Sequence, residues 1–135
     1  MTNKVIEAAT LARENSYAPY SKFRVGAALL LKNGEIIMGC NIENASYGLC
    51  NCAERTALFR AYALGYRKDD IIAMSVAGAT DGPISPCGAC RQVMVELLPV
   101  DCKIYIAYGK DFKVFETTIE ELVPFAFSKE DLNND

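Results

Sequence analysis

Three cysteines and one glutamate, which lie in two short segments, have the clearest chemical potential in this sequence. Cys52 and Glu54 belong to the first segment, and Cys87 and Cys90 form a Cys-x-x-Cys pair further along the chain. Residues at i and i+3 of a helix share a face, so this pair can hold two corners of a zinc tetrahedron. A third thiolate from Cys52 would leave the fourth position open, as in catalytic zinc sites. Glu54 is near enough in sequence to handle protons on a water molecule at that position.

The rest of the composition restricts how such a site could work. The chain contains no histidine, so a zinc site must use cysteine or carboxylate ligands, and a general base must be something other than imidazole. Three thiolates on Zn²⁺ leave a formal charge of about −1, so a cationic neighbour is expected. Arg55 or Arg91 could supply it by donating hydrogen bonds to a ligand sulfur. The positive ends of two helices that begin at the cysteine segments would also lower the cysteine pKa values.

Other interpretations of the same residues stay open at this point. Cys50 could complete a structural site with four cysteines, although the Cys50-Asn51-Cys52 spacing is awkward for chelation. Cys87 and Cys90 could form a thioredoxin-like redox pair, which would leave Cys52 and Glu54 unexplained. Glu54 could simply complement a helix dipole.

Length and charge exclude several classes of protein. The 135 residues are 51% hydrophobic and are expected to form one domain, residues 1–135. The net charge of −3 argues against a binder of nucleic-acid backbones. The longest apolar run, Val25–Leu31, is too short for a membrane span. The N-terminus has no secretory signal pattern, and six cysteines without one are expected to be free thiols or metal ligands in a cytoplasmic protein.

The elements that must position the cysteines follow from periodicity, turn residues and prolines. Asn33-Gly34 predicts a hairpin turn with positive φ at both residues. Helices are expected at 4–15, 52–64, 87–98 and from 118, and strands at 24–31, 35–39, 71–77, 103–108 and 112–116. The order α-β-β-α-β-α-β-β-α predicts an α/β fold with three layers, α-β-α, around a five-stranded mixed sheet. Both cysteine segments then lie at helix N-termini, at the edge where open α/β sheets bind ligands.

The cysteine segments resemble the zinc signature of nucleoside and base deaminases. Because it has cysteine as the first ligand, the sequence is similar to those of the small homotetrameric cytidine deaminases. Four segments carry the resemblance: Tyr17-Ala18-Pro19-Tyr20-Ser21-Lys22-Phe23, Gly39-Cys40-Asn41-Ile42-Glu43-Asn44-Ala45, Cys52-Ala53-Glu54-Arg55-Thr56-Ala57 and Ser85-Pro86-Cys87-Gly88-Ala89-Cys90-Arg91-Gln92. It implies a hydrolase that deaminates cytidine and deoxycytidine to uridine and deoxyuridine in pyrimidine salvage.

The resemblance also implies roles at the zinc. The ligands would be Cys52, Cys87 and Cys90, holding one Zn²⁺ per chain. Glu54 would take a proton from the attacking water, pass it to N3 of the pyrimidine, and later help to protonate the departing ammonia. Arg55 would offset the thiolate charge, and Gln92 would orient Arg55.

For the substrate, the resemblance implies contacts on both the base and the sugar. Phe23 would stack on the base, and the backbone of Ala53 together with the loop near Ser85 would bind its polar edge. Asn41 and Glu43 would bind the ribose hydroxyls, a pairing that suits neutral hydroxyls and repels phosphate.

Two aromatic residues are expected to act across subunits of a homotetramer. Phe127 matches a family aromatic that reaches a neighbouring site, and Tyr47 would also cross a subunit boundary. The sequence departs from the family at Phe125, where glycine is common.

Two further functions are kept as alternatives: a deaminase for an aminoacyl-nucleoside antibiotic, and a small zinc-stabilised binding module without enzymatic activity. Neither nucleic acid nor a membrane is expected as a partner.

Overall fold

The computed structural model describes residues 2–132 of the chain. The elements appear in the predicted order, with small differences at their ends. They are α1 (Thr2–Ala12), β1 (Val25–Leu31), β2 (Ile36–Cys40), α2 (Ala53–Ala63), β3 (Ile71–Gly78), α3 (Gly88–Leu97), β4 (Lys103–Tyr108), β5 (Lys113–Thr117) and α4 (Ile119–Leu122). Short 3-10 helices occupy Arg13–Asn15, Tyr47–Leu49, Lys68–Asp70 and Lys129–Asp131.

The five strands form one mixed sheet in the order β2-β1-β3-β4-β5. Strands β3 and β4 are parallel, and the other neighbouring pairs are antiparallel. The antiparallel pairing of β4 with β5 agrees with the short connection between them, which cannot form a crossover. The α/β fold with a five-stranded mixed sheet is therefore confirmed.

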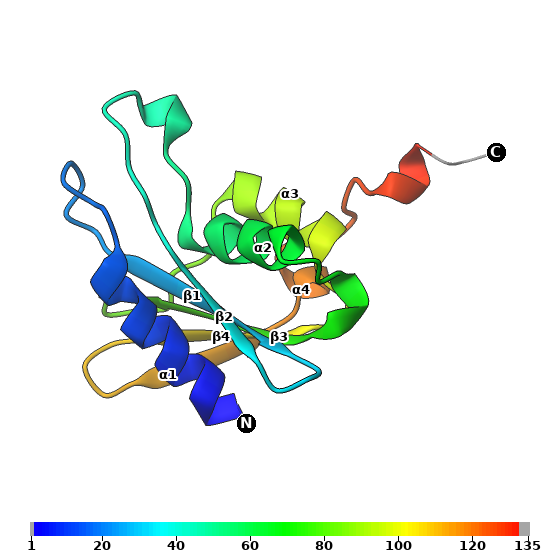
Figure 1. Ribbon diagram of the computed structural model, residues 1–135, viewed down its shortest axis with the longest axis horizontal. Coiled ribbons are helices and arrows are strands. Elements are labelled where there is room, and N and C mark those ends of the chain that lie inside the picture. The colour runs from blue at the N-terminus through cyan, green and yellow to red at the C-terminus, as the bar shows by residue number, and fades with distance from the viewer. Residues whose placement is uncertain (1, 133–135) are drawn as a thin grey trace.

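Helices cover both faces of this sheet, as Figure 1 shows, with α1 on one face and α2 and α3 on the other. Side chains of β3 alternate between the two sides, as the period of a strand requires. Met74 and Val76 join the core beneath α2 and α3, whereas Ala73 and Ala77 pack with Val5 of α1. The three-layer arrangement predicted from the sequence is confirmed. None of the helices in the described part of the chain is long and apolar enough to cross a membrane.

The turn between β1 and β2 differs from the expected one. Gly34 has a φ of 89°, but Asn33 is not among the residues with positive φ. Gly34 N–H donates to the Leu31 carbonyl at 2.9 Å, and Leu31 N–H donates to the Glu35 carbonyl at 2.9 Å. This pattern belongs to a three-residue hairpin loop that ends with a left-handed glycine, so the hairpin was predicted correctly and its turn type was not.

A second glycine, Gly39 in β2, sets how closely α2 approaches the sheet. A Cβ atom at this position would lie 2.4 Å from the Ala57 backbone nitrogen and 2.9 Å from the Ala53 carbonyl oxygen. Only a residue without a side chain allows the helix backbone to come this near. Because Cys52 is the N-cap of α2, this contact helps to place the first cysteine.

Candidate functional site

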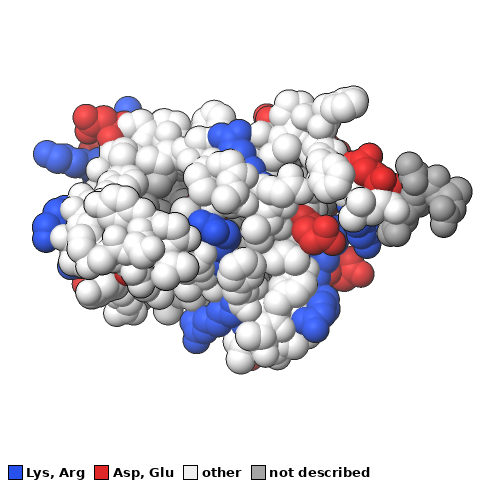
Figure 2. Space-filling model, turned by 90° about the horizontal axis from the view of Figure 1, so that it is seen from above, with Lys and Arg blue, Asp and Glu red and all other residues white. Residues whose placement is uncertain are grey.

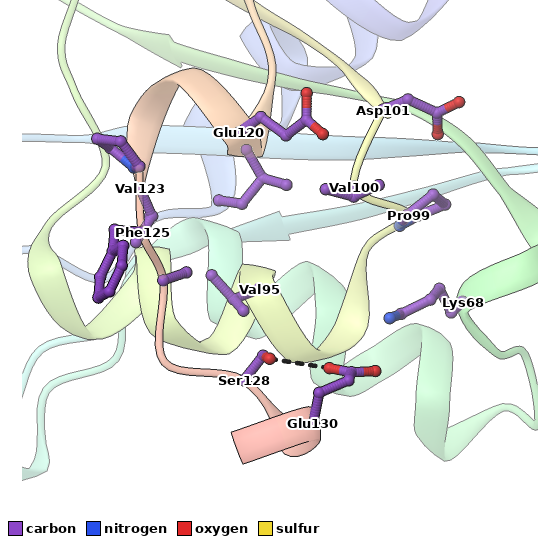
Figure 3. Close-up of a pocket in the computed structure, with 13 residues that line it drawn as sticks. Lys68, Val95, Pro99, Val100, Asp101, Glu120, Val123, Phe125, Ser128 and Glu130 are labelled. Atoms are coloured by element: carbon purple, nitrogen blue, oxygen red, sulfur yellow. Dashed lines mark hydrogen bonds between the residues drawn. The ribbon is translucent and has the colours of Figure 1, made fainter. Parts of the chain in front are cut away.

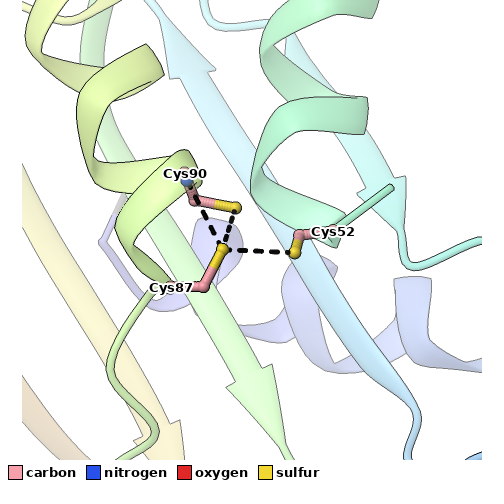
Figure 4. Close-up of side chains that lie close together, drawn as sticks. All are labelled: Cys52, Cys87 and Cys90. Atoms are coloured by element: carbon pink, nitrogen blue, oxygen red, sulfur yellow. Dashed lines mark hydrogen bonds between the residues drawn. The ribbon is translucent and has the colours of Figure 1, made fainter. Parts of the chain in front are cut away.

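The three predicted cysteines meet where α2 and α3 begin. Cys52 is the N-cap of α2, Cys87 is the N-cap of α3, and Cys90 lies in the first turn of α3. All three sulfur atoms lie within 4.8 Å of one another. The Cys52–Cys87 distance is 3.6 Å and the Cys87–Cys90 distance is 3.3 Å. Figure 4 shows the three side chains converging from the two helices.

This spacing fits a zinc ion. Four ligands at a zinc–sulfur distance of about 2.3 Å would place neighbouring sulfur atoms about 3.8 Å apart. The measured separations are close to that value, and all six cysteines are free thiols. Cys50 is not part of the cluster, and its sulfur accepts a hydrogen bond from Asn44 N–H at 3.2 Å. The geometry therefore favours three thiol ligands over the alternative with four.

Arg55, rather than Arg91, contacts a ligand sulfur. Its guanidinium donates to Cys52 Sγ at 3.5 Å. Hydrogen bonding from Cys90 and then from Arg55 lowers the pKa of Cys52 to about 5. The hydrogen bond to Cys52 and burial raise the pKa of Cys90. Arg55 and the N-terminus of α2 are placed to stabilise a thiolate at Cys52.

Arg91 instead fixes the segment that leads into Cys87. Its Nε donates to the Pro86 carbonyl at 2.8 Å, one terminal nitrogen donates to the Leu122 carbonyl at 2.7 Å, and the other bonds the Ser85 hydroxyl. Planar guanidinium groups suit such multiple, directional contacts. The loop expected near the base edge is therefore tied to the end of α4.

Glu54 is buried beside the cysteines, with 5% of its surface exposed. Burial, together with the charge of Cys52, raises the pKa of its carboxyl group to about 7. A buried carboxyl group whose pKa lies near neutrality can both accept and donate a proton at physiological pH. The structure thus brings the predicted proton carrier to the predicted ligands.

The expected ribose-binding residues are engaged with the loop before β1. Asn41 Oδ1 accepts from Val25 N–H at 2.9 Å and from the Ser16 hydroxyl, and its amide donates to the Phe23 carbonyl at 2.8 Å. This leaves one amide hydrogen of Asn41 for another partner. Phe23 itself is 39% exposed.

Glu43 is held by the same loop. Its Oε1 accepts from Tyr20 N–H at 3.0 Å and Ser21 N–H at 3.1 Å, and its Oε2 accepts from the Ser21 hydroxyl. Hydrogen bonds from the side chain and backbone of Ser21 hold the pKa of this exposed carboxyl group below its ordinary value. The sequence prediction did not include Ser16 or Ser21 as contacts, because only the pairing of distant segments identifies them.

A cavity of about 330 Å³ lies next to Glu43 and is lined by Tyr20, Ser21, Glu43, Tyr47 and Cys50. Tyr20 and Tyr47 pack edge to face, with ring centroids 6.3 Å apart. Tyr47 is 75% exposed, which leaves most of its ring available for a further contact.

Gln92 and Phe127 form a contact that the sequence did not predict. The Gln92 amide donates to the Phe127 carbonyl at 2.9 Å, and no hydrogen bond joins Gln92 to Arg55 in the described residues. Phe127 is 58% exposed. Figure 1 places the C-terminal segment and the loop at 41–51 on opposite sides of the molecule. The segment after α4 therefore lies away from the loop that carries Glu43 and Tyr47 within one chain.

A larger cavity of about 630 Å³ lies elsewhere, between α3 and the C-terminal segment. Figure 3 shows its largely apolar wall and the Ser128–Glu130 hydrogen bond at 2.8 Å on its rim. None of the cysteines and none of the other predicted site residues line this cavity.

Charged groups do not form a continuous basic surface on the face shown in Figure 2, where most residues are uncharged.

Comparison with known proteins places this arrangement among deaminases. The model of the cytidine and deoxycytidylate deaminase zinc-binding region matches residues 1–106. A cytidine deaminase of Halalkalibacterium halodurans is 55% identical over 130 residues, which are 96% of each chain. A blasticidin-S deaminase of Bacillus cereus is 34% identical over 115 residues, covering 81% of this chain and 80% of that protein. The crystal structure of a cytidine deaminase from Burkholderia pseudomallei matches with a TM-score of 0.90 and 54% identity, covering 94% of this chain and 99% of that one.

Proposed function

The chain belongs to the cytidine and deoxycytidylate deaminase family of hydrolytic deaminases, and on this premise we propose that it uses one zinc ion per chain to deaminate cytidine and deoxycytidine. The products are uridine or deoxyuridine and ammonia, as in pyrimidine salvage. One observation carries the proposal: three thiols within 4.8 Å of one another adjoin a carboxyl group that is 5% exposed.

Zinc held by Cys52, Cys87 and Cys90 would supply Lewis acidity, which makes water a competent nucleophile at neutral pH. Glu54 transfers the protons. Its carboxylate accepts a proton from the water that adds to C4 of cytosine and delivers that proton to N3. The same carboxylate then takes the remaining proton from the C4 hydroxyl and transfers it to N4 as the C4–N4 bond breaks, which leaves the C4 carbonyl of the product and ammonia. A pKa of about 7 suits both directions of transfer.

The remaining contacts hold the nucleoside in place. Phe23, which is partly exposed, stacks on the pyrimidine, and Glu43 and the free amide hydrogen of Asn41 bind the sugar hydroxyls. Ala53 is the first residue of α2, so its backbone N–H has no partner within the helix and can donate to the base. The segment at Ser85, tied down by Arg91, forms the opposite side of the base edge.

We propose a homotetramer in which Phe127 and Tyr47 complete the site of a neighbouring chain. The position of the C-terminal segment in Figure 1 and the exposure of both rings support this assembly. We also propose that residues 1–135 act as one catalytic domain on free nucleosides rather than nucleic acids, in agreement with the face in Figure 2, where Lys and Arg are scattered and form no continuous basic surface. Six free thiols support a cytoplasmic location.

The test combines a deamination assay with a zinc count. The wild-type chain should convert cytidine to uridine with one zinc per chain. Glu54→Gln should keep the fold and the zinc but lower kcat by at least about 100-fold, because the proton carrier is gone. Glu7→Gln, an exposed change on α1, serves as the matched control and should leave kcat unchanged. Wild-type protein without deaminase activity, combined with loss of metal in Cys50→Ser, would instead indicate a structural zinc module.

A second substrate is favoured by one comparison, the 34% identity with a blasticidin-S deaminase. The alternative substrate for the same chemistry is an aminoacyl-nucleoside antibiotic. The ratio of kcat/KM for cytidine and for blasticidin S decides between the two, and we expect cytidine to have the higher value because Glu43 and Asn41 suit an ordinary ribose.

A further inference from the structure

We propose that Ser21 is a positioning residue for the nucleoside, because its hydroxyl links the base-stacking residue Phe23 to the sugar-binding carboxylate of Glu43. This inference rests on the proposed function, which assigns those two contacts to the substrate. Neither the sequence pattern nor the chemistry at the cysteines requires a role for this serine. The hydrogen bonds of the loop before β1 supply the argument.

The Ser21 hydroxyl makes two contacts that run in sequence. It accepts a hydrogen bond from Phe23 N–H at 3.0 Å and donates one to Glu43 Oε2. A hydroxyl has one hydrogen and two lone pairs, so it can serve both partners at once. The backbone N–H of Ser21 adds a third contact, to Glu43 Oε1 at 3.1 Å. One residue therefore contacts both the start of the Phe23 segment and the carboxylate.

Lys22, which lies between Ser21 and Phe23 in the sequence, has a backbone conformation that needs this support. Lys22 has a φ of 62°, in the left-handed region that non-glycine residues rarely adopt. Its side chain makes no hydrogen bond or ion pair among the described residues. The bond from Phe23 N–H to the Ser21 hydroxyl closes the turn around Lys22, together with the bond from Lys22 N–H to the Ala18 carbonyl at 3.1 Å. Removal of the hydroxyl would let this turn relax and would allow the Phe23 ring to change direction.

The hydroxyl also sets the direction of the free acceptor on Glu43. An ionised carboxylate has about four lone-pair sites. Three of them are occupied by Tyr20 N–H, Ser21 N–H and the Ser21 hydroxyl. One site on Oε2 remains for a hydroxyl of the sugar, and the Ser21 hydroxyl determines where it points. Both residues line the same cavity of about 330 Å³.

The solvent exposure of Ser21 distinguishes a role in substrate positioning from a role in the stability of the fold. Ser21 is exposed and Glu43 is partly exposed, so water can replace the lost hydrogen bonds without leaving a buried polar group unpaired. Ser21→Ala should therefore keep its thermal stability and its zinc content. The Ser21→Ala variant loses the alignment of Phe23 and Glu43. This loss weakens substrate binding and leaves proton transfer at Glu54 unchanged.

The experiment measures KM and kcat of Ser21→Ala for two substrates. For cytidine, we expect KM to rise about tenfold with kcat within about twofold of wild type. For 2′,3′-dideoxycytidine, which lacks the 2′ and 3′ hydroxyls of the sugar, the rise in KM should be clearly smaller, because the contribution through Glu43 is absent. Ser21→Thr, which keeps the hydroxyl, should restore the KM for cytidine. Ser46→Ala, an exposed serine in the neighbouring loop, is the matched control and should not change KM.

Several outcomes overturn the inference. An unchanged KM for cytidine, an equal rise for both substrates, or a loss of thermal stability or zinc in Ser21→Ala would each contradict a positioning role. Glu43→Gln separates this failure from failure of the proposed function. If Glu43→Gln raises KM and Ser21→Ala does not, only the role of Ser21 is wrong. If neither variant affects a wild-type enzyme that deaminates cytidine, the proposed sugar contact at Glu43 is wrong as well.

Discussion

Substitution of Gly39 by alanine tests whether the contact between β2 and α2 positions the cysteine cluster. The new Cβ atom would meet the Ala57 nitrogen at 2.4 Å, the Ala57 Cα at 2.8 Å and the Ala53 carbonyl oxygen at 2.9 Å. All three atoms belong to the backbone of α2, so no side chain can rotate away. The helix must move instead, and Cys52 moves with it because it caps the same helix.

The size of the effect follows from the overlap. Ordinary contacts of a Cβ atom begin near 3.4 Å, so α2 would shift by about 1 Å. Overpacking of this kind costs about 1–3 kcal/mol, which corresponds to a fall in Tm of roughly 3–12 °C for a chain of this size. Metal–ligand distances at a well-formed site fall within about 0.2 Å of their usual values. A misplacement of about 1 Å at a catalytic site can lower activity about 100-fold.

The assay therefore has two readouts. Thermal unfolding gives Tm, and a titration with zinc followed by cytidine kinetics gives the metal affinity and kcat/KM. Gly82→Ala is the control, because a Cβ atom at that exposed loop position meets no atom within 4 Å. A Gly39→Ala variant with the Tm, zinc affinity and kcat/KM of wild type would refute the idea that this contact places Cys52. A variant that loses Tm alone would show that the contact supports the core and not the metal site.

Three other variants test separate parts of the site. Arg55→Gln removes the charged donor at 3.5 Å from Cys52 Sγ and should weaken zinc binding about 10–100-fold, measured by competition with a chelator; unchanged affinity would mean that the helix N-termini alone offset the thiolate charge. Phe127→Ala should raise KM for cytidine about tenfold, as expected for loss of about 1–2 kcal/mol of stacking, while an unaltered KM would leave this ring as packing only. Phe125→Gly should raise Tm by a few degrees, because Phe125 has a φ of 56° and its side chain is fully exposed, so glycine relieves backbone strain of about 1 kcal/mol. A lower Tm in that variant would show that the Phe125 ring is buried between chains.

Much of the fold was predictable because local signals agreed with one another. Apolar runs, prolines and glycines marked each helix and strand, and the short link between β4 and β5 fixed their antiparallel pairing. The turn at Asn33-Gly34 was the exception. Its dipeptide is compatible with more than one loop length, and the pairing of Leu31 with Glu35 selects the three-residue form.

The contacts of the proposed substrate residues were less predictable than the cysteine cluster. Metal ligands are recognisable because few side chains can bind zinc and their spacing on a helix is restricted. The contacts of Glu43 with Ser21, and of Gln92 with the Phe127 carbonyl, join segments that are remote in sequence. Serine and glutamine bond many partners, so their identity alone gives no information about which one they meet.

By itself, then, the sequence determined the chemistry: three thiols, one carboxylate, no imidazole, and helices that begin at both cysteine segments. Only the tertiary structure decided the environment of those groups. The close approach of α2 to Gly39 places Cys52, burial raises the pKa of Glu54 to about 7, and the pairing of β1 with β2 brings Asn41 and Glu43 against the Phe23 loop. The physical reason is that residue type fixes which bonds a group can make, whereas desolvation and contact distance depend on how remote segments pack.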